Sequence, residues 1–128
     1  LTIPWRTLWL GTGISLEKED AFDDEYTYQR VSSELSVSRE LIFDIFCRVH
    51  YHFRYTKYEE PGSLFIDDRE DYHHLVGLDM KRKLWESKQN TDRHIMLNIS
   101  LFHNNAMSNI DLYDYTQEVI QMNVAYQF

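Results

Sequence analysis

The 128 residues suffice for one domain, which would bury roughly two-thirds of the surface of its unfolded chain. An aromatic content of 15% argues against a disordered chain, and Cys47, the only cysteine, excludes an internal disulfide and a cysteine-based zinc site. The formal net charge of −8 argues against general binding to nucleic-acid phosphates, which relies on clustered lysines and arginines.

The N-terminal part of the chain predicts two strands separated by an acidic loop. Residues 3–9 alternate in polarity and end at Gly11 and Gly13, which favours a strand followed by a turn. The acid-rich run 17–25 is typical of a solvent-exposed loop. Residues 26–35 alternate less regularly and predict a second strand with a register shift.

A predicted helix is followed directly by the clearest strand of the chain. Ser38 is a suitable cap for a helix that ends near Phe46, because the apolar residues after it recur at helical spacing. Residues 48–56 then alternate between polar and apolar without one exception, as in a strand with two different faces. One face carries Val49 and aromatic residues. The other carries the polar members Arg48, His50, His52 and Arg54.

The second half of the chain predicts two further helices and two strands. Residues 59–62 have the composition of a turn, and Asp67 with Glu70 resembles the capping box of a main helix that reaches about Lys88. Residues 94–102 carry apolar side chains on both faces and predict a central strand. A short helix is expected from Ser108 to about Glu118, and the alternating residues 120–128 predict a final strand.

These elements predict a single α+β domain over residues 1–128. We expect a mostly antiparallel sheet of about four to six strands, with two or three helices packed on one face. Residue 1 is Leu and the last alternating pattern reaches Phe128, so we expect the domain to be excised from a longer protein. No apolar run approaches the ~20 residues of a membrane-spanning helix. We therefore expect a domain that does not associate with a membrane, and the single cysteine, Cys47, favours an intracellular location, cytoplasmic or nuclear.

The strongest functional signal is the polar face of residues 48–56. We call its members Arg48, His50, His52 and Arg54 the basic ladder. Arginine offers forked donors to carboxylates or phosphates, and histidine gains positive charge just below neutral pH. An acidic segment of a partner would suit such a surface. The alternative is internal pairing, either with the acidic run 20–25 or with carboxylates on a neighbouring strand.

Two functions from different classes follow. We expect a non-catalytic protein–protein interaction or assembly domain that binds another protein through the basic ladder and through exposed aromatic residues. A homo-oligomer is compatible with this hypothesis, whereas nucleic acid is disfavoured. The alternative is a small α+β enzyme or ligand-binding domain with its pocket between the sheet and the long helix. There His50 or His52 would exchange protons with a carboxylate such as Asp71.

The candidate metal-binding and catalytic residues of this sequence also have plainer interpretations. His50 and His52 lie two residues apart, so they could share an ion with His94 or His103 as a third ligand. The flanking arginines would repel that cation, and we expect no metal and no cofactor. The sequence has no glycine-rich phosphate loop, nucleophile elbow or His-Glu-x-x-His motif, so no catalytic residue is assigned.

Overall fold

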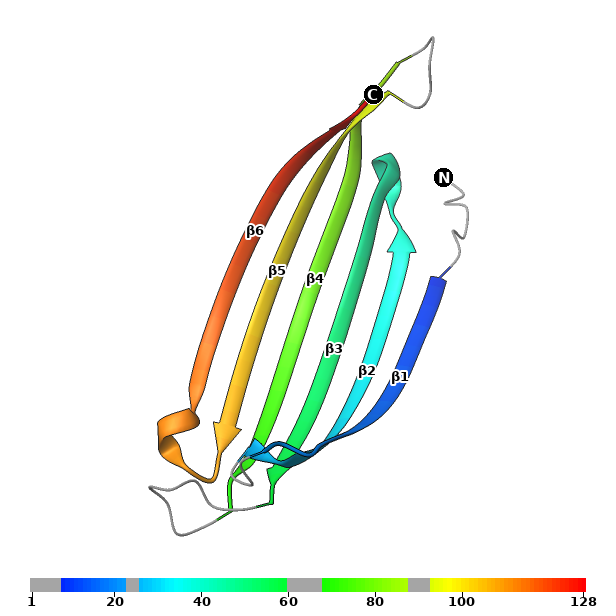
Figure 1. Ribbon diagram of the computed structural model, residues 1–128. Helices are drawn as coiled ribbons and strands as arrows, with labels where there is room; N and C mark the ends of the chain where they lie inside the picture. Colours follow the sequence, from blue (N-terminus) through cyan, green and yellow to red (C-terminus); the bar gives the residue numbers. More distant parts are fainter. Residues whose placement is uncertain (1–7, 23–25, 60–67, 88–92) are drawn as a thin grey trace.

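The computed structural model describes residues 8–22, 26–59, 68–87 and 93–128. Six strands form one antiparallel sheet in which each strand pairs with its neighbours in the sequence. Figure 1 shows them side by side in one curved layer, with β1 and β6 at the outer edges. The strands are β1 (Leu8–Glu19), β2 (Tyr28–Glu40), β3 (Ile45–Tyr58), β4 (Glu70–Glu86), β5 (His94–Ser108) and β6 (Tyr115–Gln127).

The predicted α+β class is wrong. Over the described residues the chain forms no α-helix, and the helical elements with defined bounds are two short 3₁₀ turns, η2 (Ile42–Asp44) and η3 (Asp111–Tyr113). No helix of this part is therefore long and apolar enough to cross a membrane. The expected antiparallel sheet is present, but no helices pack on it.

The predicted main helix is the longest strand, β4. Tyr72, Val76 and Met80 lie on one face of the sheet, as strand alternation requires. The helical spacing arose from Leu75, which lies on the opposite face and sits three residues after Tyr72 and next to Val76. Strands with apolar residues on both faces imitate a helical pattern in this way.

The helix predicted from Ser38 to Phe46 is a tight reversal between β2 and β3. Phe43 (φ 61°, ψ 30°) and Asp44 (φ 55°) are both left-handed, as in the type I′ turns that join antiparallel strands. The Leu41 N–H donates to the Ile45 carbonyl oxygen at 2.7 Å. The turn escaped prediction because such positions usually hold Asn-Gly, whereas a bulky residue seldom adopts a positive φ.

Other element boundaries also moved. β1 continues through both glycines into the predicted acidic loop, and β2 pairs with β1 and β3 without a register shift. The short helix expected after Ser108 reduces to η3. The strands predicted at 48–56 and 94–102 are confirmed within β3 and β5, and the final strand within β6. Residues 1–7, 23–25 and 60–62, which carry parts of the predicted first strand, acidic loop and turn, lie outside the described residues.

The sheet has one apolar face and no layer over it within the described chain. Directly opposed residues share a face, and one row is apolar from edge to edge: Leu10, Val37, Val49, Leu78, Leu101 and Ile120. Among the described hydrophobic residues only Ala106, 3% exposed, is buried. The accessible surface of 9872 Å² exceeds the about 7200 Å² of a compact protein of this mass.

Candidate functional site on the polar face

The other side of the sheet, which we call the polar face, carries most of the hydrogen-bonding side chains. One row across it, next to the apolar row but pointing the opposite way, contains Trp9, Ser38, Arg48, Asp79, Ser100 and Gln121. The row beside it contains Phe46, Lys81, Asn98 and Asn123. Strands β3, β4 and β5 thus bring residues far apart in the sequence into one polar patch.

All four residues of the basic ladder lie on the polar face of β3, where their alternation places them. Arg48 Nη2 donates to Glu34 Oε1 at 2.7 Å, and His50 Nδ1 lies 3.4 Å from Asp79 Oδ2. These carboxylates belong to the neighbouring strands β2 and β4. Arg48 is therefore paired internally, by one of the two routes that the sequence left open, whereas His50 has a carboxylate within ion-pair distance but its Nδ1 makes no hydrogen bond.

The other half of the ladder has no such partner. His52 and Arg54 make no hydrogen bond or ion pair to any residue in the described ranges, and Arg54 Nε is shielded from solvent. His52 lies opposite Glu34, but that carboxylate already accepts from Arg48. The prediction that the ladder binds a partner stays a prediction, and Arg54 is the member with an uncompensated charge.

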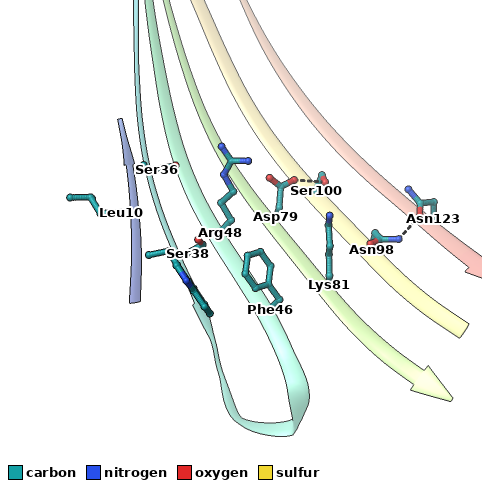
Figure 2. Close-up of a pocket in the computed structure, with 12 residues that line it drawn as sticks. Leu10, Ser36, Ser38, Phe46, Arg48, Asp79, Lys81, Asn98, Ser100 and Asn123 are labelled. Atoms are coloured by element: carbon teal, nitrogen blue, oxygen red, sulfur yellow. Dashed lines mark hydrogen bonds between the residues drawn. The ribbon is translucent and has the colours of Figure 1, made fainter. Parts of the chain in front are cut away.

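A hollow of about 630 Å³ lies on the polar face beside the ladder. We call it the polar hollow, and Figure 2 shows side chains of β3, β4, β5 and β6 gathered around it. Ser100 Oγ donates to Asp79 Oδ1 at 2.6 Å, and Asn98 Nδ2 donates to Asn123 Oδ1 at 2.8 Å. Its aromatic members are Trp9 and Phe46, whose ring centroids lie 6.3 Å apart.

Sequence reasoning missed most of the polar hollow. Asp79 and Lys81 were assigned to a helix, which hid their position beside Arg48 and Phe46. Asn98 was placed on a strand but given no role. The available signal was the alternation in β4, because a strand there puts Asp79 directly opposite Arg48.

The geometry of the predicted enzyme pocket does not form. The long helix that was to make one wall of it is β4. Asp71 is 3% exposed and accepts from Arg69 Nε at 2.9 Å and from Arg69 Nη2 at 2.5 Å. Asp71 lies opposite Thr56 in the β3–β4 register, and Thr56 is six residues from His50 along β3, so Asp71 and His50 are not neighbours.

The histidines that were weighed as metal ligands are divided between the two faces. His50 and His52 lie on the polar face. His103 lies on the apolar face, where its Nδ1 is 3.5 Å from Glu118 Oε1. His103 therefore cannot complete a site with the pair. No group of three potential ligands comes together in the part of the chain that the structure describes.

A further histidine of the polar face, His73, lies in a partly desolvated position. Burial lowers the pKa of His73 below its usual 6.5, and the positive charge of Arg54 lowers it further, while Asp71 opposes the shift. The imidazole ring lies 6.0 Å from the ring of Tyr115, in an edge-on arrangement. The neutral form is thus favoured in the folded chain.

Comparison of the chain with protein-family models, with curated proteins and with solved structures gives no match.

Proposed function

We propose that this sheet is part of a membrane protein, with its apolar face against lipid acyl chains and its polar face toward water. Its role would be to form a wall between lipid and an aqueous space. The observation that carries the proposal is the apolar row that runs across all six strands, with exposed members on β1, β2, β3 and β6. The earlier expectation of a domain without membrane contact took no account of such a face.

The exposure of this face is difficult to reconcile with water on both sides. Ile14 and Ile120 are 81% and 79% exposed, and Leu16 is 77% exposed. Each Å² of apolar surface left in water costs about 25 cal/mol, and large apolar patches on proteins mark interaction sites. A covering of apolar chemistry over the whole face removes that cost.

Ionisable residues on the apolar face flank its central apolar row, and His74 lies between Tyr72 and Val76. Arg39 follows Val37 near the end of β2, and Arg82 follows Met80 near the end of β4. On β6, Glu118 precedes Ile120. Only the central row is therefore apolar on all six strands, and the rows beside it include a few charged or titratable side chains. Strands of 12 to 17 residues exceed the about 9–11 residues that a tilted strand needs to cross the hydrocarbon layer.

Aromatic residues gather toward both ends of the apolar face. At one end the rings of Tyr55 and Tyr72 lie 4.9 Å apart, with burial as the main cause that raises the pKa of Tyr55. At the other end the rings of Tyr126 and Phe128 stack at 5.9 Å, and Trp85 lies two strands away on the same face. Tyrosine and tryptophan favour the boundary between lipid and water, because each combines an apolar ring with a polar tip.

In a membrane, the free backbone hydrogen-bonding groups at the outer edges of the sheet need partners. Over the described residues, β1 and β6 each pair with one strand only. Lipid offers no hydrogen-bond partners to their free backbone groups, so other strands must pair with both edges inside a membrane. We expect those strands to come from a second copy or from further parts of a longer chain.

Two single-tryptophan variants test the proposal. Ile120 and Gln121 are neighbours on β6 that face opposite ways. Ile120→Trp and Gln121→Trp are made in a background with Phe at the three natural tryptophans, and the chain is reconstituted into phosphatidylcholine vesicles with brominated acyl chains. Bromine quenches nearby indoles, so the tryptophan at 120 is expected to lose most of its fluorescence and the one at 121 much less.

Three results would contradict a lipid-facing sheet. The first is failure of the folded chain to float with vesicles in a density gradient. The second is equal quenching at the two positions. The third is an apolar face occupied by a second copy, shown by a dimer of unchanged size after detergent is removed and by a tryptophan at 120 that stays unquenched.

A protein partner on the basic ladder is the second candidate function. It is favoured by Arg54, whose guanidinium has no acidic partner in the described part of the chain. The double variant Arg48→Glu and Arg54→Glu should keep the β-sheet circular dichroism spectrum and lose binding to a polyglutamate peptide. A lost spectrum would show that the ladder is structural, and unchanged binding would remove this candidate.

A further inference from the structure

We infer that the polar hollow binds a small ligand with an anionic head, a carboxylate or a phosphate, and a flat apolar body. The hollow lies on the polar face, so the inference does not depend on what covers the apolar face. Its volume of about 630 Å³ falls within the range of small-molecule sites.

The anionic head is assigned from the hydrogen-bond donors that two cations of the hollow leave unused. Lys81 lines it and makes no ion pair or hydrogen bond with any residue in the described segments. Arg48 gives one donor, Nη2, to Glu34 and keeps other guanidinium donors. Asp79 Oδ1 accepts a hydrogen bond from Ser100 Oγ, and Asp79 Oδ2 lies 3.4 Å from His50 Nδ1. Two cations thus have hydrogen-bond donors to spare, and the hollow's own acid already accepts one hydrogen bond from Ser100.

The two cations are placed so that one anion can contact both. Arg48 lies opposite Asp79 in the β3–β4 register, and Lys81 is two residues further along β4 on the same face. Diagonal neighbours of this kind lie about 7–8 Å apart at the backbone. Figure 2 shows both side chains on the same side of the sheet, and Asp79 lies between Arg48 and Lys81 in this view. A carboxylate or phosphate between them would accept charge-assisted hydrogen bonds from each.

The flat apolar body is assigned from the rings beside these cations. Phe46 lies directly opposite Lys81, and Trp9 packs against Phe46 at an interplanar angle of 46°. Trp9 is 46% exposed and so offers free ring surface. A planar apolar group can rest on these rings while its charged end reaches Lys81, and the amides of Asn98 and Asn123 flank that end.

The test uses the whole chain in detergent micelles that preserve its β-sheet spectrum, with three probes of similar shape. Phenyl phosphate and benzoate carry the two anionic heads, and benzyl alcohol carries none. Isothermal titration measures their affinities. We expect at least one anion to bind more tightly than benzyl alcohol, and the two anions together show which head is preferred.

Matched variants locate the site. Lys81→Gln should weaken binding of the anion about tenfold, and Arg48→Gln should also weaken it. Lys57→Gln is the control, because Lys57 carries the same charge on the opposite face, where it pairs with Glu70 at 3.3 Å. Lys81→Arg should retain binding. Absence of binding by both anions, equal binding of benzyl alcohol, or unchanged affinity in Lys81→Gln would overturn the inference.

Discussion

The imidazole ring of His50 lies against Gly77, so closely that a Cβ at position 77 would overlap its Cε1 and Nε2 atoms. The two residues are directly opposed in the β3–β4 register. Glycine inside a strand usually weakens it, and it is found where another group must approach the backbone. Here that group is the imidazole of His50, whose Nδ1 lies 3.4 Å from Asp79 Oδ2.

Gly77→Ala should therefore displace the His50 ring and destabilise the sheet. The added methyl group overpacks a site that has no room for it, at a cost of about 1–3 kcal/mol. A urea titration of the chain in micelles, followed by β-sheet circular dichroism, measures the change in the free energy of unfolding.

Two variants show whether the contact is the cause. Gly13→Ala is the control, because a Cβ there would meet its nearest neighbour, Glu34, at an ordinary 3.9 Å. Its stability should be unchanged or slightly higher. Adding His50→Ala to Gly77→Ala should restore most of the lost stability. A double variant as unstable as Gly77→Ala would show that the ring is not what the methyl group meets.

Asp71→Asn should be among the most destabilising single changes in the sheet. It removes the charge from a buried carboxylate that binds Arg69 twice, while the Arg69 guanidinium also lies 3.4 Å from the centre of the Tyr113 ring. Breaking a largely buried pair from one side costs roughly 3 kcal/mol. In contrast, Glu86→Gln breaks the exposed Lys83–Glu86 pair and should cost less than about 1 kcal/mol. Similar costs in the same urea titration would contradict this assignment.

Stability should fall when the pH drops below 6.5, with His73 as one contributor. Burial, the main cause, lowers the pKa of His73 in the folded chain, so the unfolded chain takes up the proton first as pH decreases. The free energy of unfolding then decreases from pH 6.5 down to the folded pKa of His73. In His73→Gln this part of the slope should be absent. An identical pH dependence in the variant and the parent chain would contradict the prediction.

Ile120→Arg should destabilise the sheet in a bilayer far more than Gln121→Arg. The first places a cation in the apolar row, where a lipid-facing charge costs about 2–4 kcal/mol. The second adds the same charge to the same strand on the polar face, next to water. Folding yields in phosphatidylcholine vesicles over a urea series measure the difference. Equal effects of the two arginines would argue that lipid does not contact position 120.

Strand prediction from the sequence succeeded where alternation was strict. Residues 48–56 alternate without exception and lie within β3, and the two faces predicted for them are the two faces of the sheet. It failed in β4, where Leu75 on the polar face supplied a helical spacing. It also failed at Phe43 and Asp44, because the residues of this turn lack the composition that marks a type I′ reversal.

The site could be predicted only in part, because its contacts join different strands. The sequence placed Arg48, His50, His52 and Arg54 on one face, but the register that sets Asp79 beside Arg48 depends on recognising β4 as a strand. The uncovered apolar face was hidden by the same error. Two or three helices were expected to pack on one face, so its exposed residues were interpreted as core.

The order β1 to β6 means that every strand is hydrogen-bonded to the strand that precedes or follows it in the chain. Each pairing closes only a short loop, which makes its entropic cost small and allows hairpins to form early. The sheet can therefore form by successive hairpins, because the unpaired backbone groups at the edge of each hairpin can bind the next strand. Its edge strands are also the places where a further hairpin could join without disturbing any existing pair.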